Sequence, residues 1–167
     1  MKVLAYNLPA YHRIPENDEW WGEGFTEWDN VRKGKPLYKG HVQPLVPYRG
    51  YYYDLSKKED VIYQAELAKQ YGLDGFVYYH YWFNGKLLLE IFRDAKNVEL
   101  NYCLCWANEP WARTWDGKEG QILMPQTFGG KEDWENHLQY FLTFFIDKRY
   151  IKRNNSPMLF VCSASRI

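Results

Sequence analysis

Four short runs of apolar residues divide the chain, and each has the length and composition of a β-strand. They are almost continuously apolar rather than alternating, which is typical of parallel strands that are covered on both faces. The runs span residues 2–8, 75–81, 101–107 and 157–163.

Apolar residues at helical spacing lie between the later runs. The first predicted helix starts at a capping box formed by Ser56 and Glu59 and stops at Gly72. The apolar faces of this helix and of two more are, in order, Val61, Ile62, Ala65 and Ala68; Leu88, Ile91, Phe92 and Ala95; and Trp134, Leu138, Phe141, Leu142 and Phe145. Trp134, Phe141 and Phe145 are expected in the core.

The predicted order is β, long loop, α, β, α, β, loop, α, β. Such alternation indicates one α/β domain over residues 1–167, with a parallel sheet and right-handed crossovers. A TIM-type barrel and a doubly wound sheet both satisfy this order. A complete barrel needs roughly 250 residues, so the barrel alternative would be truncated to about its first half, β-α-β-α-β-α-β.

The connection after the first strand is unusually long. It runs for roughly 45 residues, whereas structureless loops beyond about 12–15 residues are uncommon. Disordered segments are poor in aromatic residues, but this one contains Trp20, Trp21, Phe25 and Trp28. We therefore expect a folded, functional loop at the carboxyl end of the first strand.

Charge and aromatic content narrow the possible partners. Lysine plus arginine and aspartate plus glutamate both number 21, so no basic excess supports a nucleic-acid partner. Aromatic residues make up 19 % of the chain, and many lie beside polar residues. Flat apolar faces with polar edges suit a saccharide ligand.

Three clusters of tryptophans and polar residues follow predicted strands, where barrels and open α/β sheets place their sites. They occupy residues 19–28, 80–86 and 106–117. We expect substrate-binding residues among Trp20, Trp21, Glu27, Trp28, His80, Tyr81, Trp82, Trp106, Asn108 and Trp111.

Each candidate also has a simpler structural interpretation. His80 is either a hydroxyl ligand or a core histidine, and Glu27 either binds substrate or pairs with Arg32 or Lys33 to hold the loop. About half of the tryptophans should only fasten the loop to the sheet. Glu109 is the candidate catalytic carboxylate, and its alternatives are loop hydrogen bonding and hydroxyl binding.

Three segments carry a family resemblance: IPENDEWWG at residues 14–22 with FTEW at 25–28, YYHYWFNGK at 78–86 and CLCWANE at 103–109. With His41, Gln43 and Pro44, they resemble the N-terminal half of the WbsX glycosyltransferase family, which is related to glycoside hydrolase family 99. The resemblance implies a (β/α)8 barrel. It also implies a later Asn-Glu-Trp-type segment that supplies catalytic glutamates, so we expect this chain to lack them; Pro110 departs from the asparagine usual in that family.

The resemblance implies a glycosyltransferase-like, carbohydrate-active protein of bacterial lipopolysaccharide or O-antigen synthesis. Alternatives are an endo-mannosidase-like glycoside hydrolase and a non-catalytic saccharide-binding remnant. Half a barrel would leave two open strand edges, which favour self-association or a partner chain.

The remaining expectations concern cofactors, thiols and location. His12, His41 and His80 lack metal-ligand spacing, so neither a metal nor a cofactor is expected. No segment is long enough to span a membrane. Cys103, Cys105 and Cys162 lie in predicted strands, and we expect buried free thiols in the cytoplasm.

Overall fold

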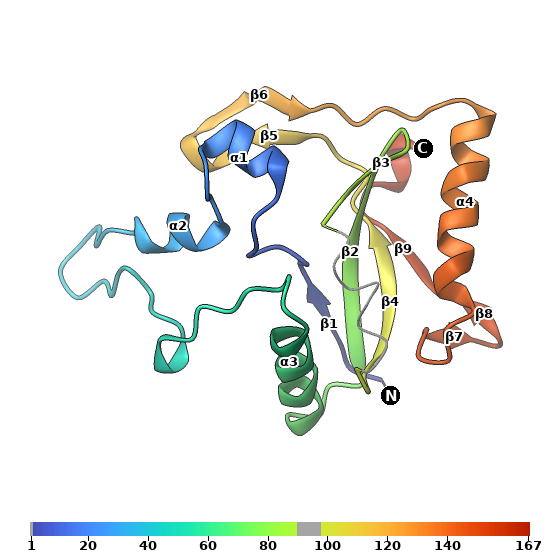
Figure 1. The fold of residues 1–167 in the computed structure, drawn as a ribbon, viewed down its shortest axis with the longest axis horizontal. Coiled ribbons are helices and arrows are strands. Elements are labelled where there is room, and N and C mark those ends of the chain that lie inside the picture. Colours follow the sequence, from blue (N-terminus) through green and yellow to red (C-terminus); the bar gives the residue numbers. More distant parts are fainter. Residues whose placement is uncertain (1, 90–97) are drawn as a thin grey trace.

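A parallel sheet forms the centre of the computed structural model, which describes residues 2–89 and 98–167. Its strand order is β1-β2-β4-β9 (Figure 1), and all three pairings along this path are parallel. The strands are β1 (Leu4–Asn7), β2 (Gly75–Phe83), β4 (Asn101–Trp106) and β9 (Leu159–Val161). All four predicted strands and their parallel arrangement are therefore confirmed, although β2 is longer than predicted and β9 is shorter.

Two long helices complete the main core. They are α3 (Lys58–Gln70) and α4 (Lys131–Phe145), and both bury residues in the hydrophobic cluster that includes β2 and β4. The predicted capping box at the start of α3 is wrong, because Lys57 is the N-cap and makes no side-chain cap bond. The Ser56 hydroxyl instead donates to Asp54 Oδ1 at 2.6 Å.

Helix α4 is rotated relative to its predicted core face. It buries His137, Tyr140, Phe141 and Phe144, whereas Trp134, Leu138 and Leu142 are exposed. The sequence offers two overlapping aromatic stripes on this helix. The stripe that contains His137 packs against the sheet, because this ring stacks on Trp82 of β2, with centroids 4.5 Å apart.

The long first connection is folded, as expected. It contains α1 (Pro15–Trp21), α2 (Glu27–Arg32) and the 3-10 turn η1 (Tyr48–Gly50). At the start of α2, Asp29 Oδ2 accepts the backbone N–H of Thr26 at 2.8 Å. Such a bond satisfies one of the free donors at a helix N-terminus.

Several short elements were not predicted. The second helix was predicted from Leu88 onward, but Leu88 ends a strand that pairs with β2; the other marker residues, at 91, 92 and 95, lie outside the described part of the chain. The additional elements are β3 (Lys86–Leu88), β5 (Trp111–Arg113), η3 (Thr114–Asp116), β6 (Lys118–Met124), β7 (Lys152–Arg153), β8 (Ser156–Pro157) and η4 (Ala164–Arg166).

The two faces of the sheet have different neighbours. On one face, His80 and Trp82 of β2 pack against α4. On the other, Tyr6 of β1 stacks on Tyr79 of β2, with ring centroids 5.4 Å apart. Because side chains alternate along a strand, consecutive residues of β2 belong to two separate environments.

The three cysteines are free among the described residues, but only two of them are buried. Cys103 and Cys105 lie within β4, whereas Cys162 is exposed just after β9. The expectation that Cys162 is buried is therefore wrong. Its Sγ lies 3.4 Å from Sγ of Cys105 in the neighbouring strand β4.

Candidate functional site

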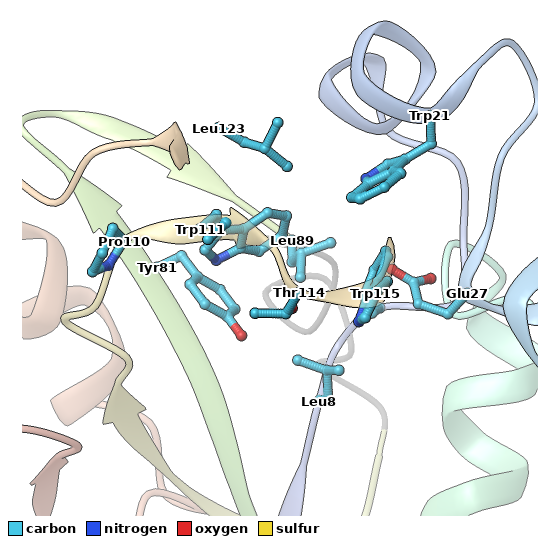
Figure 2. Close-up of a pocket in the computed structure, with 12 residues that line it drawn as sticks. Leu8, Trp21, Glu27, Tyr81, Leu89, Pro110, Trp111, Thr114, Trp115 and Leu123 are labelled. Atoms are coloured by element: carbon cyan, nitrogen blue, oxygen red, sulfur yellow. The ribbon is translucent and has the colours of Figure 1, made fainter. Parts of the chain in front are cut away.

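A pocket of about 230 Å³ lies beyond the carboxyl ends of β1 and β2 (Figure 2). Its walls come from the loop after β1, from α1 and α2, from β2 and from the β5–β6 hairpin (Figure 1). Parallel sheets place ligand sites at this end of the strands. The lining residues are Leu8, Ala10, Trp21, Glu27, Tyr81, Leu89, Pro110, Trp111, Ala112, Thr114, Trp115 and Leu123.

Aromatic rings form two groups around this pocket. Trp21 packs against Trp115 at a centroid distance of 5.2 Å, and Phe25 stacks on both rings. In the second group, Trp111 meets Tyr81 edge to face at 5.1 Å. Tryptophan and tyrosine rings of this kind offer apolar faces to a ligand.

The guanidinium of Arg113 adds a positive charge beside the first aromatic group. It lies 4.6 Å from the centroid of a Trp21 ring, within the range of a cation–π interaction. The contact joins the β5–β6 hairpin to α1. Both elements contribute to the pocket, so the contact fixes one wall relative to the other.

Glu27 brings a carboxylate to the pocket and is itself mostly buried. Its Oε2 accepts the backbone N–H of Tyr11 at 2.6 Å, and Asn17 Nδ2 lies 3.5 Å from its Oε1. The predicted alternative partner Arg32 instead pairs with Asp29 at 3.5 Å. Glu27 therefore holds the loop after β1 while one side of it faces the pocket.

Tyr81, near the carboxyl end of β2, contributes a second polar group to the pocket after Glu27. Burial raises the pKa of its phenol well above the usual range, so the hydroxyl keeps its proton at neutral pH and can donate a hydrogen bond. Thr114 adds a hydroxyl from the hairpin side. The site thus combines apolar ring faces with a few convergent polar groups, an arrangement that suits a partly apolar polyhydroxylated ring.

Four of the predicted site residues line this pocket: Trp21, Glu27, Tyr81 and Trp111. Two more lie close by without lining it. Trp20 meets Trp111 edge to face at 5.7 Å, and so supports the pocket wall. Trp28 donates its indole N–H to Tyr53 O at 2.8 Å and packs on Tyr11, so it fastens the long loop.

His80, Trp82 and Trp106 lie on the other face of the sheet. His80 is fully buried, and its Nε2 lies 2.9 Å from Nε2 of His137. Trp82 donates its indole N–H to Asp133 Oδ1 at 2.9 Å, and Trp106 meets the His137 ring edge to face. The structure therefore places these three side chains beneath α4 rather than in the pocket.

Within the buried pair of His80 and His137, the pKa of His137 departs strongly from its ordinary value. Burial lowers the pKa of His137 to about 3, and the neighbouring His80 contributes further. A lowered histidine pKa means that the folded protein favours the neutral ring. This pair consequently ties the stability of the core to pH.

The two polar candidates after β4 have different surroundings. Asn108 is fully buried and bonds through its side chain to the backbone of Ser163. Glu109 is exposed, and its Oε1 lies 3.8 Å from Arg166 Nη2. The following residue, Pro110, lines the pocket, so Glu109 stands next to its rim.

Eight lining residues were not among the predicted site residues. Trp115 is the most informative, since the sequence places it four residues after Trp111 in the third cluster. The backbone turns just after it, where Gly117 adopts a positive φ of 74°. The missed residues are Leu8, Ala10, Leu89, Pro110, Ala112, Thr114, Trp115 and Leu123.

Comparison with known sequences gives a match over nearly the whole chain. Residues 3–167 match the family described as Glycosyltransferase WbsX. The protein WxcX of two strains of Xanthomonas campestris pv. campestris, itself described as uncharacterized, is 40% identical over 163 residues, 95% of this chain. The chain spans only 23% of the length of these relatives.

One solved structure shares the fold. It is the GH99 endo-α-mannosidase from Bacteroides thetaiotaomicron in complex with bis-tris-propane, with a TM-score of 0.55 and 12% sequence identity. The similarity covers 99% of this chain and 43% of the mannosidase chain.

Among the described residues of our chain, none of the helices is long and apolar enough to cross a membrane.

Proposed function

This chain belongs to the glycosyltransferase WbsX family, and on that premise we propose that its aromatic pocket binds a saccharide. The proposed context is a glycosyltransferase-like protein of bacterial surface polysaccharide synthesis, such as lipopolysaccharide or O-antigen. Because the chain spans 23% of the length of its WxcX relatives, the activity of a whole protein belongs to the same proposal.

The proposal of saccharide binding rests on the residues that line the pocket and on its position in the fold. Trp21, Trp111 and Trp115 surround a space of about 230 Å³, and Glu27 lies at its side. Sugar rings carry apolar C–H faces and a polar rim of hydroxyls, which tryptophan faces and a carboxylate can recognise together. The pocket also stands at the strand ends where barrels place their sites.

We further propose that the sheet is about the first half of a TIM-type barrel. The parallel order β1-β2-β4-β9 supports this, as does a fold shared with 43% of the mannosidase chain. In that arrangement, the face carrying Tyr6 and Tyr79 would point into the barrel, and the face covered by α4 would point outward.

Glycosidic chemistry sets a requirement that this pocket meets only in part. Such reactions use two carboxylates, about 5–5.5 Å apart for retention and about 6.5–9.5 Å for inversion. Here Glu27 is committed to Tyr11 N–H, and Glu109 is exposed beside Arg166. Glu109 remains our proposed catalytic carboxylate, and we expect a carboxylate from outside the described pocket to act with it.

A glycoside hydrolase is the second candidate function. The observation that favours it is the fold shared with an endo-α-mannosidase. Both candidate functions require saccharide binding in the same pocket. They differ in whether an activated sugar donor is needed.

Binding and turnover test the two parts separately. Quenching of tryptophan fluorescence by a panel of mono- and oligosaccharides should reveal saturable binding to this chain, with competition among related sugars. The full-length protein would then be incubated with an oligomannoside, with and without nucleotide sugars. Release of sugar without a donor supports the hydrolase, donor-dependent extension supports the transferase, and no saturable quenching by any sugar contradicts the saccharide site.

A further inference from the structure

A surface loop that does not line the pocket combines two unusual properties. It spans residues 33–49, from the end of α2 into η1, and we call it the basic loop. In Figure 1 it projects away from the sheet and the main helices, at the left of the view. Its own contacts give it a defined shape: His41 Nδ1 accepts the N–H of Leu37 at 3.2 Å, and the rings of Tyr38 and His41 stack.

The first property is a one-sided charge. The basic loop contains Lys33, Lys35, Lys39 and Arg49, and the sequence has no aspartate or glutamate from residue 30 to residue 53. The whole chain, by contrast, is neutral. Among the described residues, no ion pair involves any of these four side chains.

The second property is a group of large apolar side chains left in solvent. Leu37 is 84% exposed, Tyr48 78% and Val42 73%. Large apolar patches exposed on soluble proteins commonly mark interaction sites. The exposed apolar side chains of the loop are Leu37, Tyr38, Val42, Leu45, Val46 and Tyr48.

We propose that the basic loop docks this protein onto an anionic lipid surface. Interfacial segments use exposed apolar and aromatic side chains to enter the headgroup region, and flanking lysines and arginines attract anionic lipids. Tyrosine suits this boundary because its ring is apolar and its hydroxyl is wet. The loop interleaves these residue types, with Lys35, Leu37, Tyr38 and Lys39 within five positions.

The composition favours a lipid surface over other anionic partners. A nucleic-acid site needs basic groups with stacking or groove contacts, but aliphatic Leu37, Val42, Leu45 and Val46 have no such role. An acidic protein segment would satisfy the charges yet leave most of this aliphatic area without a matching apolar partner. A bilayer interface accepts both at once.

Co-sedimentation with lipid vesicles tests the proposal. Vesicles of phosphatidylcholine alone are compared with vesicles of phosphatidylcholine and phosphatidylglycerol in equal parts. We expect binding to the anionic vesicles, weakened by added salt because screening shortens the range of the attraction. The variant K33E/K35E/K39E should lower the partition coefficient roughly 100-fold, since each surface charge contributes strongly to such binding.

A matched variant controls for net charge. The substitutions K148E, K152E and R153E remove the same charge from exposed positions near the β7–β8 hairpin, across the molecule from the loop (Figure 1). This variant should bind nearly as well as the unmodified chain. A second test variant, L37S/V42S/L45S, should also lose binding while its charge is unchanged.

Three outcomes would overturn the assignment. They are equal binding to neutral vesicles, equal losses in the two charge variants, and binding to polyglutamate as tight as to the anionic vesicles. The last result would assign the loop to an acidic protein partner. Circular dichroism of each variant establishes that the fold is retained, and vesicle binding is independent of whether the pocket binds a sugar.

Discussion

The side-chain amide of Asn108 makes two hydrogen bonds to the backbone of Ser163. Its Nδ2 donates to the Ser163 carbonyl at 2.8 Å, and its Oδ1 accepts the Ser163 N–H at 2.9 Å. These two bonds extend the hydrogen-bonded contact between β4 and β9 beyond the ends of both strands. It holds together two strand ends at the edge of the proposed site.

Replacing this amide should weaken the fold. Asn108→Ala removes both bonds and leaves two backbone groups without their partner, so we expect a loss of about 2–3 kcal/mol in unfolding free energy. Urea denaturation measures it. Gln121→Ala, at an exposed position of β6, serves as the control, and equal stability of the two variants would contradict a clamping role.

The histidine pair beneath α4 should make stability depend on pH. The pKa of His137 falls from 6.5 to about 3 on folding, so the unfolded chain binds the additional proton between these values. Stability should therefore be complete above about pH 6.5 and fall by roughly 1.5 kcal/mol between about pH 6.5 and pH 5.

Urea denaturation across that range tests this dependence. His137→Gln should flatten it, whereas Gln121→Ala, which replaces a non-titrating exposed residue of β6, should leave it unchanged. An unaltered pH dependence in His137→Gln would show that another group carries it.

Removing a pocket ring should weaken saccharide binding. Trp115→Ala deletes a face beside Trp21, and we expect about tenfold weaker binding, or about 1.4 kcal/mol. Calorimetric titration with the best ligand measures the effect. Trp134→Ala is the matched control, because that indole is partly exposed on α4 and does not line the pocket; identical losses would place the sugar elsewhere.

The three thiols should differ in reactivity. Burial raises the pKa of Cys103 to about 11 and that of Cys105 to about 12, which suppresses their reactive thiolate forms. Cys162 is exposed. A thiol reagent at neutral pH should therefore label one cysteine quickly, with the other two reacting only after denaturation. Peptide mapping should identify Cys162, and rapid labelling of all three would contradict the described burial.

Gly75 should not tolerate a larger residue. A Cβ built there lies 2.5 Å from the carbonyl oxygen of Asn101 on the paired strand. Gly75→Ala should cost about 2 kcal/mol through forced separation of β2 and β4. Gly120→Ala provides the comparison, since no atom of the part of the chain that the structure describes lies within 4 Å of its added methyl. The difference in thermal or urea midpoint between the two variants is the measurement.

The central strands β2 and β4 were predictable because their burial is nearly complete. In β2, eight of nine residues are buried, and the ninth is partly so. That same property concealed which face each side chain occupies. His80, Tyr81 and Trp82 are all apolar or aromatic, yet only Tyr81 reaches the pocket. Adjacent residues of a strand point to opposite faces, so the three could not share one site.

The hairpin wall of the pocket was harder to foresee. Strand β6 contains Lys118, Gly120 and Gln121 among its seven residues, and its pairing with β5 has register shifts. Neither strand shows the alternation that marks a half-buried hairpin. Trp115 therefore lines the pocket because of tertiary contacts, which the local sequence pattern does not indicate.

The pocket is assembled from stretches as distant as Leu8 and Leu123, so it does not exist in the unfolded chain. Any molecule that occupies it must raise the melting temperature by mass action, by an amount that grows with ligand concentration relative to Kd. A thermal-shift screen of sugars, nucleotide sugars and lipid-linked glycans could thus identify the natural ligand before any reaction has been observed.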